Sequence, residues 1–298
     1  MHLIFFDDHL KEGFLPFTYT RPVSDLRIGT LTLAEKWAFD MSASHTHSEH
    51  SGLSTDTFQV YINSRWLASP SMRQILESLQ PGEILVCEKN FLAFRQNQGQ
   101  GKIDFQNLDS LNLSPKELPN AELIERVTDI FTKNGAEIIK DFPRLTTGKT
   151  SEKLDVNNQL IGSENQLFIE PGAKIQGAIL NVTEGPIYIG RDAEVMEGSL
   201  VRGPFSLGNH SVLKMGAKIY GNTTIGPWSK VGGEVSNSVI FGFSNKGHDG
   251  FLGNSIIGMW CNLGADTNTS NLKNNYGDVR MWNYSAKEMR STGLTFCG

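Results

Sequence analysis

Between Ile189 and Val231 an aliphatic residue occupies every sixth position of the chain. The series is Ile189, Val195, Val201, Leu207, Leu213, Ile219, Ile225 and Val231. A glycine follows the aliphatic residue at positions 190, 208 and 226, which are eighteen residues apart. No α-helix or ordinary strand has this period, whereas hexapeptide β-helices do. The sequence therefore predicts a left-handed parallel β-helix in which three hexapeptides form one triangular coil and the aliphatic side chains point inward.

The repeat begins weakly near Ile169 and Ile175 and slips in phase after Val231, around Gly232-Gly233-Glu234. It resumes at Val239, Phe251, Ile257 and Leu263. We therefore expect the β-helix to span residues 165–272, within a second domain of residues 159–298.

Beyond Leu272 the repeat fades, and a helix is expected at residues 286–290. Nothing there resembles the cap that an open coil stack normally needs. The chain is therefore interpreted as the truncated form of a longer gene product.

The first half of the chain, residues 1–158, alternates predicted strands with predicted helices, which is typical of an α/β domain. Strands are expected at residues 3–6 and 59–62, a hairpin at 84–87 and 91–95, and helices at 31–39, 70–79 and 122–134. Gly135 is expected to cap the last helix at its carboxyl end. Residues 42–57 are polar and are interpreted as a mobile loop.

The composition of the chain argues against a nucleic-acid-binding protein and against a membrane-spanning protein. The chain is 39% hydrophobic and 20% charged, with a net charge of −5, which gives no indication of a nucleic-acid partner. No apolar run is long enough to span a bilayer. Three cysteines without metal-type spacing are typical of reduced thiols in a cytoplasmic protein.

In the second domain, a polar and glycine-rich loop at residues 245–253 interrupts the coils and carries Lys246 and His248. Acyl transfer to an amine requires a base that removes a proton, and a histidine suits that role. The alternative is a surface histidine bonded to a neighbouring coil. Several asparagines follow, which can bind sugar hydroxyls or occupy turns of positive φ.

In the first domain, residues 15–37 follow the first strand and precede a helix, where α/β folds bind phosphate. Arg21, Arg27 and Lys36 are candidate phosphate contacts, although no glycine-rich fingerprint is present. They are alternatively surface cations on a loop. Asp7 and Asp8 are candidate ligands of a divalent metal, or simply end the strand.

Several stretches carry a resemblance to known enzymes. They are LPFTYTRPV (15–23), GPIYIG (185–190), GAKIYG (216–221), SNKGHDGFLG (244–253) and residues 261–276. The second half resembles the acetyltransferase domain of the bifunctional N-acetylglucosamine-1-phosphate uridylyltransferase/glucosamine-1-phosphate N-acetyltransferase. The first half resembles a divergent sugar nucleotidyltransferase domain that is fused to such prisms in Bacteroidetes.

The resemblance implies that His248 is the catalytic base and that Asn262 and Asn271 contact the substrate. Phe251 replaces a substrate-contacting tyrosine, and Leu272 replaces another, with Tyr276 four positions later. Lys218 aligns with an arginine that contacts the sugar phosphate, and Lys246 is a further candidate substrate contact. Because the acetyl-CoA site of that enzyme uses later coils and an adjacent subunit, we expect weak acetyl transfer by the 298-residue chain.

The resemblance implies synthesis of a nucleotide sugar of the UDP-N-acetylglucosamine type. The first domain would join a sugar 1-phosphate to UTP with Mg²⁺, and the prism would use acetyl-CoA to acetylate glucosamine 1-phosphate, in a cytoplasmic homotrimer. One alternative is a single-activity acyltransferase with a degenerate first domain. Another is a non-catalytic trimeric scaffold that binds sugar nucleotides.

Overall fold

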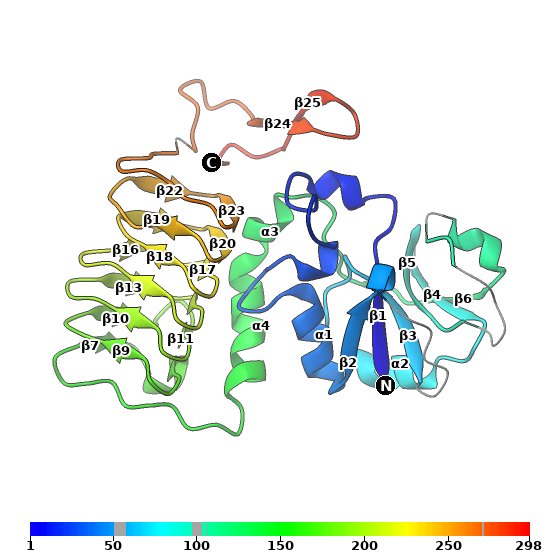
Figure 1. The fold of residues 1–298 in the computed structure, drawn as a ribbon, viewed down its shortest axis with the longest axis horizontal. Coiled ribbons are helices and arrows are strands. Elements are labelled where there is room, and N and C mark those ends of the chain that lie inside the picture. The colour runs from blue at the N-terminus through cyan, green and yellow to red at the C-terminus, as the bar shows by residue number, and fades with distance from the viewer. Residues whose placement is uncertain (51–57, 97–102, 106, 270) are drawn as a thin grey trace. The chain divides into compact units, whose positions relative to one another are not determined.

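The computed structural model describes residues 1–298 except 51–57, 97–102, 106 and 270 (Figure 1). The chain divides into two compact units. Unit 1 comprises Met1–Leu26 and Thr32–Val127, and unit 2 comprises Arg27–Leu31 and Thr128–Gly298. A short segment from the first half of the sequence is therefore part of the second unit. None of the helices in the described residues combines the length and the apolar character needed to cross a bilayer.

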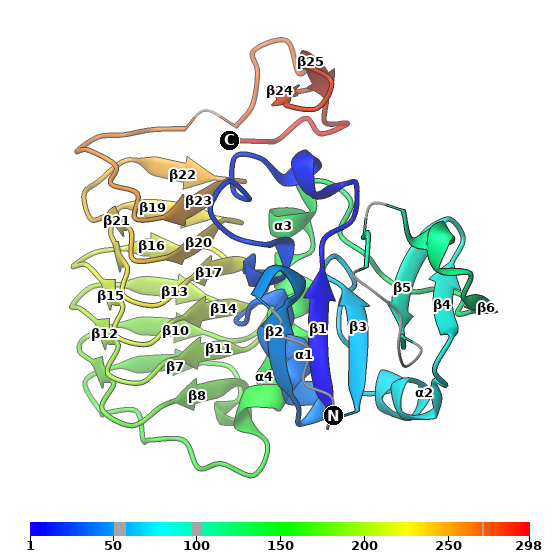
Figure 2. The same cartoon turned by 45° about the vertical axis from the view of Figure 1, so that its right-hand side comes forward.

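Unit 1 is built on a mixed sheet with the strand order β2-β1-β3-β5-β4-β6 (Figure 2). Its strands are β1 (His2–Phe6), β2 (Ser44–His47), β3 (Gln59–Asn63), β4 (Glu83–Cys87), β5 (Asn90–Phe94) and β6 (Ser114–Glu117). β1 pairs in parallel with β2 on one side and with β3 on the other. The unit also contains α1 (Leu33–Met41), α2 (Met72–Ser78) and the 3₁₀ turns η1 (Lys11–Phe14), η2 (Val23–Asp25), η3 (Ser48–His50) and η4 (Leu108–Leu111).

Several strands and helices of unit 1 form where the hydrophobic pattern predicts them. In β1, residues 3–6 are all buried although successive side chains point to opposite faces of the sheet, as expected for a strand covered on both sides. Helix α1 begins with a capping box, in which the Thr32 hydroxyl accepts from the Glu35 N–H and the Glu35 carboxylate accepts from the Thr32 N–H. The expected strands, the hairpin β4–β5 and the helices α1 and α2 are confirmed.

Two expectations for this half of the chain are wrong. Residues 44–47, expected in a loop, form β2, because their backbone pairs with β1 and an edge strand accepts polar side chains. The rest of that expected loop, residues 51–57, lies outside the described residues.

The expected helix over 122–134 is replaced by α3 (Asp129–Thr132) and α4 (Asn134–Thr146), and Leu123 pairs instead with Trp66 in an isolated bridge. Gly135 lies inside α4 and does not cap a helix. A Cβ at residue 135 would collide with the side chain of Asn222, so the absence of a side chain at Gly135 permits close packing there.

Unit 2 is a left-handed parallel β-helix with three sheets, each named here after its first strand. The β7 face consists of β7 (Gln159–Ile161), β10 (Ile179–Asn181), β13 (Leu200–Arg202), β16 (Lys218–Ile219), β19 (Glu234–Ser236) and β22 (Phe251–Gly253). The β8 face consists of β8 (Leu167–Ile169), β11 (Ile187–Ile189), β14 (Phe205–Leu207), β17 (Thr223–Ile225), β20 (Val239–Gly242) and β23 (Ile256–Met259). The β9 face consists of β9 (Lys174–Ile175), β12 (Glu194–Val195), β15 (Val212–Leu213), β18 (Lys230–Val231) and β21 (Asn245–Lys246). The 3₁₀ turn η5 (Glu164–Gln166) precedes β8.

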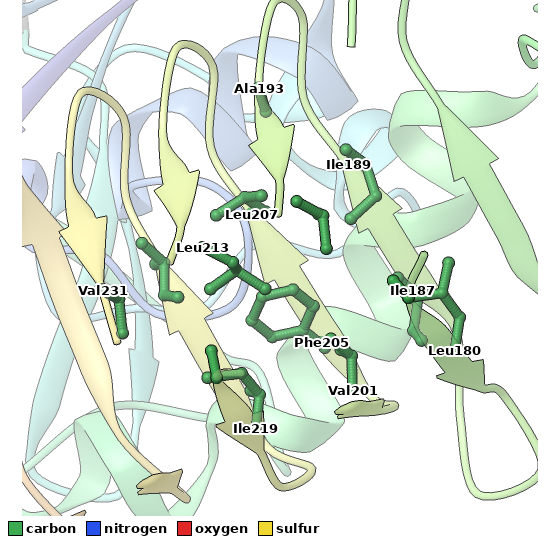
Figure 3. Close-up of a cluster of buried hydrophobic side chains, with 14 of the residues drawn as sticks. Leu180, Ile187, Ile189, Ala193, Val201, Phe205, Leu207, Leu213, Ile219 and Val231 are labelled. Atoms are coloured by element: carbon green, nitrogen blue, oxygen red, sulfur yellow. The ribbon is translucent and has the colours of Figure 1, made fainter. Parts of the chain in front are cut away.

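The interior of the prism is the predicted aliphatic column. All eight residues of the period-six series are at most 2% exposed and belong to one apolar cluster (Figure 3). Phe205, which the period does not include, also fills this interior. The first solenoid strand begins at Gln159, whereas the two compact units divide at Val127.

The phase slip after Val231 is a shortening of one coil. Leu207 pairs with Ile225, eighteen positions on, whereas Ile225 pairs with Ile240, fifteen positions on. The inward apolar residues of the later coils therefore include Val235, Ile240, Leu252 and Ile257. The expectation that Val239 and Phe251 continue the inward series is wrong by one residue.

The three faces of the prism have different surroundings within unit 2. On the β8 face, α4 packs against β14 and β17, and the Thr224 hydroxyl donates to the Gly29 carbonyl oxygen at 3.0 Å. Outward residues there are buried, as Phe168, Tyr188 and Phe241 illustrate. On the β9 face the outward residues include Lys174, Glu194 and Lys230. The β7 face exposes the apolar side chains of Ile161, Leu200 and Tyr220 beside Arg202 and Lys218.

The last part of unit 2 differs from the expected helix at 286–290. Residues 280–291 form an antiparallel hairpin of β24 (Arg280–Asn283) and β25 (Glu288–Ser291). The chain then returns to the last coil, where the Cys297 and Gly298 N–H groups donate to the carbonyl oxygens of Asn271 and Asn254, each at 3.0 Å. This segment thus covers part of the last coil, which the sequence did not predict.

Candidate functional site

The strand order of unit 1 creates a switch point beside β1. The chain passes from β1 to β2 on one side and then to β3 on the other, and all three strands are parallel. In open α/β sheets ligands bind at the carboxyl ends of the strands at such a point. Asp7 and Asp8 directly follow β1, and Asn63 ends β3.

Asp8 is held by a buried arginine. Arg65 Nη2 lies 2.6 Å and Nε 3.0 Å from Asp8 Oδ2, and Asn63 Nδ2 donates to the same oxygen at 2.9 Å. Burial alone would raise the pKa of Asp8, but the hydrogen bonds and charge of Arg65 lower it below its usual value. Arg65 also donates to Asn90 Oδ1 and to the Ile124 carbonyl oxygen. The guanidinium therefore joins β1, β3 and the β4–β5 turn into a rigid floor.

Asp7 lies in a second cluster of charges. Its carboxylate accepts from the Val23 N–H at 3.2 Å and lies 3.1 Å from Lys11 Nζ and 3.5 Å from His47 Nε2. Burial acts to raise the pKa of Asp7, but the neighbouring His47 and Lys11 lower it below its usual value. The contacts of Asp7 with Lys11 and with the Val23 N–H thus stabilise the loop that follows β1.

A cavity of about 390 Å³ opens beside Asp8. It is lined by Asp8, His9, Val86, Glu88, Lys89, Asn90, Phe91, Phe105, Leu108 and Asp109. One wall is aromatic, and Phe105 stacks on the core residue Phe6 with ring centres 5.4 Å apart. Lys89 is exposed at this cavity and forms no ion pair within the described residues.

Sequence reasoning missed most of this cavity. His9, Arg65, Lys89 and Asn90 were not among the predicted site residues. The three-residue connection Glu88-Lys89-Asn90 between the strands of the expected hairpin was a usable signal, since short turns at a sheet end commonly carry functional side chains.

The carboxylates of unit 1 do not fit a preformed metal site. Asp7 and Asp8 already bind cationic groups, and the described residues contain no cluster of three or more histidine, cysteine or acidic side chains able to hold a metal ion. No chemical step is therefore assigned here to Mg²⁺.

The predicted phosphate contacts fall in different places. Arg21 is half-buried in the loop between β1 and α1, and its charge acts on Asp25. Lys36 lies within α1 and is fully buried. Arg27 belongs to unit 2, where its Nε donates to the Phe241 carbonyl oxygen at 3.2 Å and its Nη1 to the Thr30 carbonyl oxygen. None of the three lines the cavity.

In unit 2, His248 lies in the loop between β21 and β22, at the corner from the β9 face to the β7 face. Its ring is exposed and forms no hydrogen bond or ion pair within the described part of the chain. The corners stack closely, since a Cβ on Gly233 would lie 2.8 Å from the Gly250 carbonyl oxygen. Tight glycine corners therefore place an open imidazole at the edge of the prism.

Two of the other predicted solenoid residues lie close to each other at the end of β22. Phe251 and Asn271 meet beside Gly253, where a Cβ would lie 2.5 Å from the Phe251 ring and 2.6 Å from Asn271 Nδ2. Asn262 instead accepts from Asn245 Nδ2 at 2.8 Å, one step of an asparagine ladder.

Lys218 lies outward on β16, two coils before Phe251 on the same face. Tyr276 is exposed in the loop after Asn271. Lys246 is buried, and its partners among the described residues are the main-chain oxygens of Gly232 and His248.

Fold and site together define a two-part protein, an α/β unit with a polar cavity at its switch point and a left-handed β-helix. Residues 3–150 match the family model described as sugar nucleotidyl transferase. A comparison with curated proteins finds no match. The first part of the chain is thus sugar nucleotidyltransferase-like, and this likeness indicates a transferase of nucleotide-sugar biosynthesis.

Proposed function

We propose that unit 1 transfers the uridylyl group of UTP to the phosphate of a sugar 1-phosphate, which releases pyrophosphate and gives a UDP-N-acetylglucosamine-type product, with Mg²⁺ as the cofactor that accompanies the triphosphate. The observation that carries this proposal is the cavity at the carboxyl ends of the strands, which lies within the stretch that matches sugar nucleotidyl transferases. A degenerate first domain that binds no nucleotide is the alternative.

The cavity offers suitable contacts for such a substrate. The aromatic wall of Phe91 and Phe105 can pack against a base or sugar ring, while Lys89 and His9 can approach phosphate oxygens. The Asp8–Arg65 pair keeps the floor rigid, and rigidity reduces the entropy lost on binding. Catalysis in nucleotidyl transfer depends mainly on such positioning and on charge stabilisation.

Isothermal titration calorimetry with UTP and with UDP-N-acetylglucosamine, with and without Mg²⁺, tests this function. Lys89→Met is expected to weaken binding by about 1–3 kcal/mol, since it removes a charge-assisted phosphate contact at the cavity. Lys116→Met is the control, because Lys116 pairs with Glu83 and does not line the cavity. Absence of heat with either ligand would favour the degenerate domain.

For unit 2 we propose acetyl transfer from acetyl-CoA to glucosamine 1-phosphate, with His248 as the base. This rests on the open imidazole at a glycine corner and on the adjacent strand β22, where Phe251 and Asn271 lie together beside Gly253. We place both reactions in the cytoplasm, where the three unpaired cysteines would remain reduced.

We also propose that the chain forms a homotrimer through the β7 face. Ile161, Leu200 and Tyr220 are 38–47% exposed there, whereas α4 covers the β8 face. Light scattering at micromolar concentration should show three chains, and Leu200→Glu should yield the monomer. Lys230→Glu, on the β9 face, should leave the trimer intact. A monomeric wild-type protein would refute this assembly.

A further inference from the structure

Lys246 occupies an inward position of the prism. Ile175, Val195, Leu213 and Val231 form one inward column along the β9 face, and each is paired in register with the next. The following member of the column, in register with Val231, is Lys246. Its side chain is only 3% exposed. A charge at an aliphatic position carries a large desolvation penalty unless hydrogen bonds compensate for it.

The ammonium group of Lys246 bonds to two corners of the prism. Its Nζ donates to the carbonyl oxygen of Gly232 at 2.9 Å and to that of His248 at 3.0 Å. Gly232 belongs to the corner of the preceding coil, directly after Val231. Burial lowers the pKa of Lys246, while the charge of Asp249 opposes that shift. One buried cation thus connects the corner that contains Gly232 to the main chain of His248.

Residues 248–250 have few other attachments in the described structure. The Glu234 N–H donates to the Gly250 carbonyl oxygen and the Asp266 N–H to the Asp249 carbonyl oxygen, both at 3.2 Å. The bond from Lys246 is shorter than either and is the one that reaches His248 itself. Loss of the Lys246 ammonium group would therefore free the main chain of the loop at His248.

We infer that Lys246 is a positioning residue that holds the loop of residues 247–250, and with it the imidazole of His248, against the Gly232-Gly233 corner. The catalytic consequence rests on the proposed acetyl transfer, whereas the effect on the loop does not. An opposing interpretation is that Lys246 only stabilises the fold. The two interpretations predict different responses to an apolar residue of similar length.

Lys246→Met separates them, because methionine continues the aliphatic column without a buried charge. We expect an unchanged or higher thermal midpoint, since replacing a buried ion by apolar atoms is commonly neutral or stabilising. Amide exchange of Glu234 and Asp266, measured by NMR, should become at least about tenfold faster, because their acceptors lie in the released loop. Lys246→Gln, which keeps an N–H donor group but loses the charge, should give an intermediate rate. Lys230→Met, an outward lysine on the preceding strand, is the matched control and should change neither quantity.

Acetyl transfer supplies the second readout. Lys246→Met should lower kcat by at least about tenfold with little change in KM for glucosamine 1-phosphate, as expected when a base is misplaced after substrate binds. Unchanged exchange at Glu234 and Asp266 would overturn the inference. A lower thermal midpoint with uniformly faster exchange in all coils would overturn it as well, in favour of general stabilisation. Faster exchange at the loop in a protein whose activity does not depend on His248 would leave the inference standing and refute only the proposed function.

Discussion

Replacing His248 by alanine is expected to lower kcat for acetylation of glucosamine 1-phosphate by about 10²–10⁴-fold, the usual effect of losing a general base. The amine must lose a proton as it attacks the thioester, and the exposed imidazole at the prism corner is the group we assign to that task. Because the ring forms no hydrogen bond within the described residues, its removal should leave the thermal midpoint and the oligomeric state nearly unchanged.

Steady-state kinetics of acetyl-CoA consumption measures this effect. His210→Ala is the control, because His210 lies at a different corner of the prism, stacked on Trp228 with ring centres 4.1 Å apart. We expect its kcat to stay within about twofold of the wild type. If kcat of a stably folded His248→Ala protein fell by less than about threefold, His248 would be a surface histidine without a role in catalysis.

Leu213→Asp should unfold the prism. Leu213 is fully buried in the middle of an inward column, between Val195 and Val231, so the new carboxylate would have no water and no cation nearby. Burying an unpaired charge destabilises a protein by several kcal/mol, which exceeds what most single substitutions cost. Loss of the cooperative thermal transition, followed by circular dichroism, is the expected result.

Met215→Asp provides the matched control two residues away. Its side chain is 72% exposed at a corner, so the same carboxylate should be solvated and the thermal midpoint should hardly change. A soluble and cooperatively folding Leu213→Asp protein would show that the period-six column does not form the core.

The solenoid was the most predictable part of the fold. Each inward residue of a coil is determined by the local period alone, so the sequence predicts the interior from Ile189 to Val231. The three-residue shortening after Ile225 was not predictable to the residue, because only the register with the preceding coil reveals which side chain points inward. Lys246 illustrates this, since its inward position is visible only through its pairing with Val231.

The site of unit 1 was less predictable, because contacts between residues far apart in the sequence form it. Asp8 was found as a residue after a strand, but its partner Arg65 is 57 residues away and no local pattern indicates the pair. Lys36 and Arg27 had the charge expected of phosphate contacts, yet one is buried in α1 and the other bonds to the Phe241 carbonyl oxygen. Charge and order along the chain cannot distinguish a cation that faces a cavity from one that packs inside.

The segment Arg27–Leu31 has a consequence for synthesis on the ribosome. Its residues belong to unit 2, and the bond from Arg27 to Phe241 joins positions 214 residues apart. Translation proceeds at about 5–20 residues per second, so this peptide emerges on the order of ten seconds or more before its partner strand exists. Its final position is therefore reached only after most coils have been made. Nascent chains stalled before Phe241 should leave the segment open to proteases, while chains released after that point should protect it.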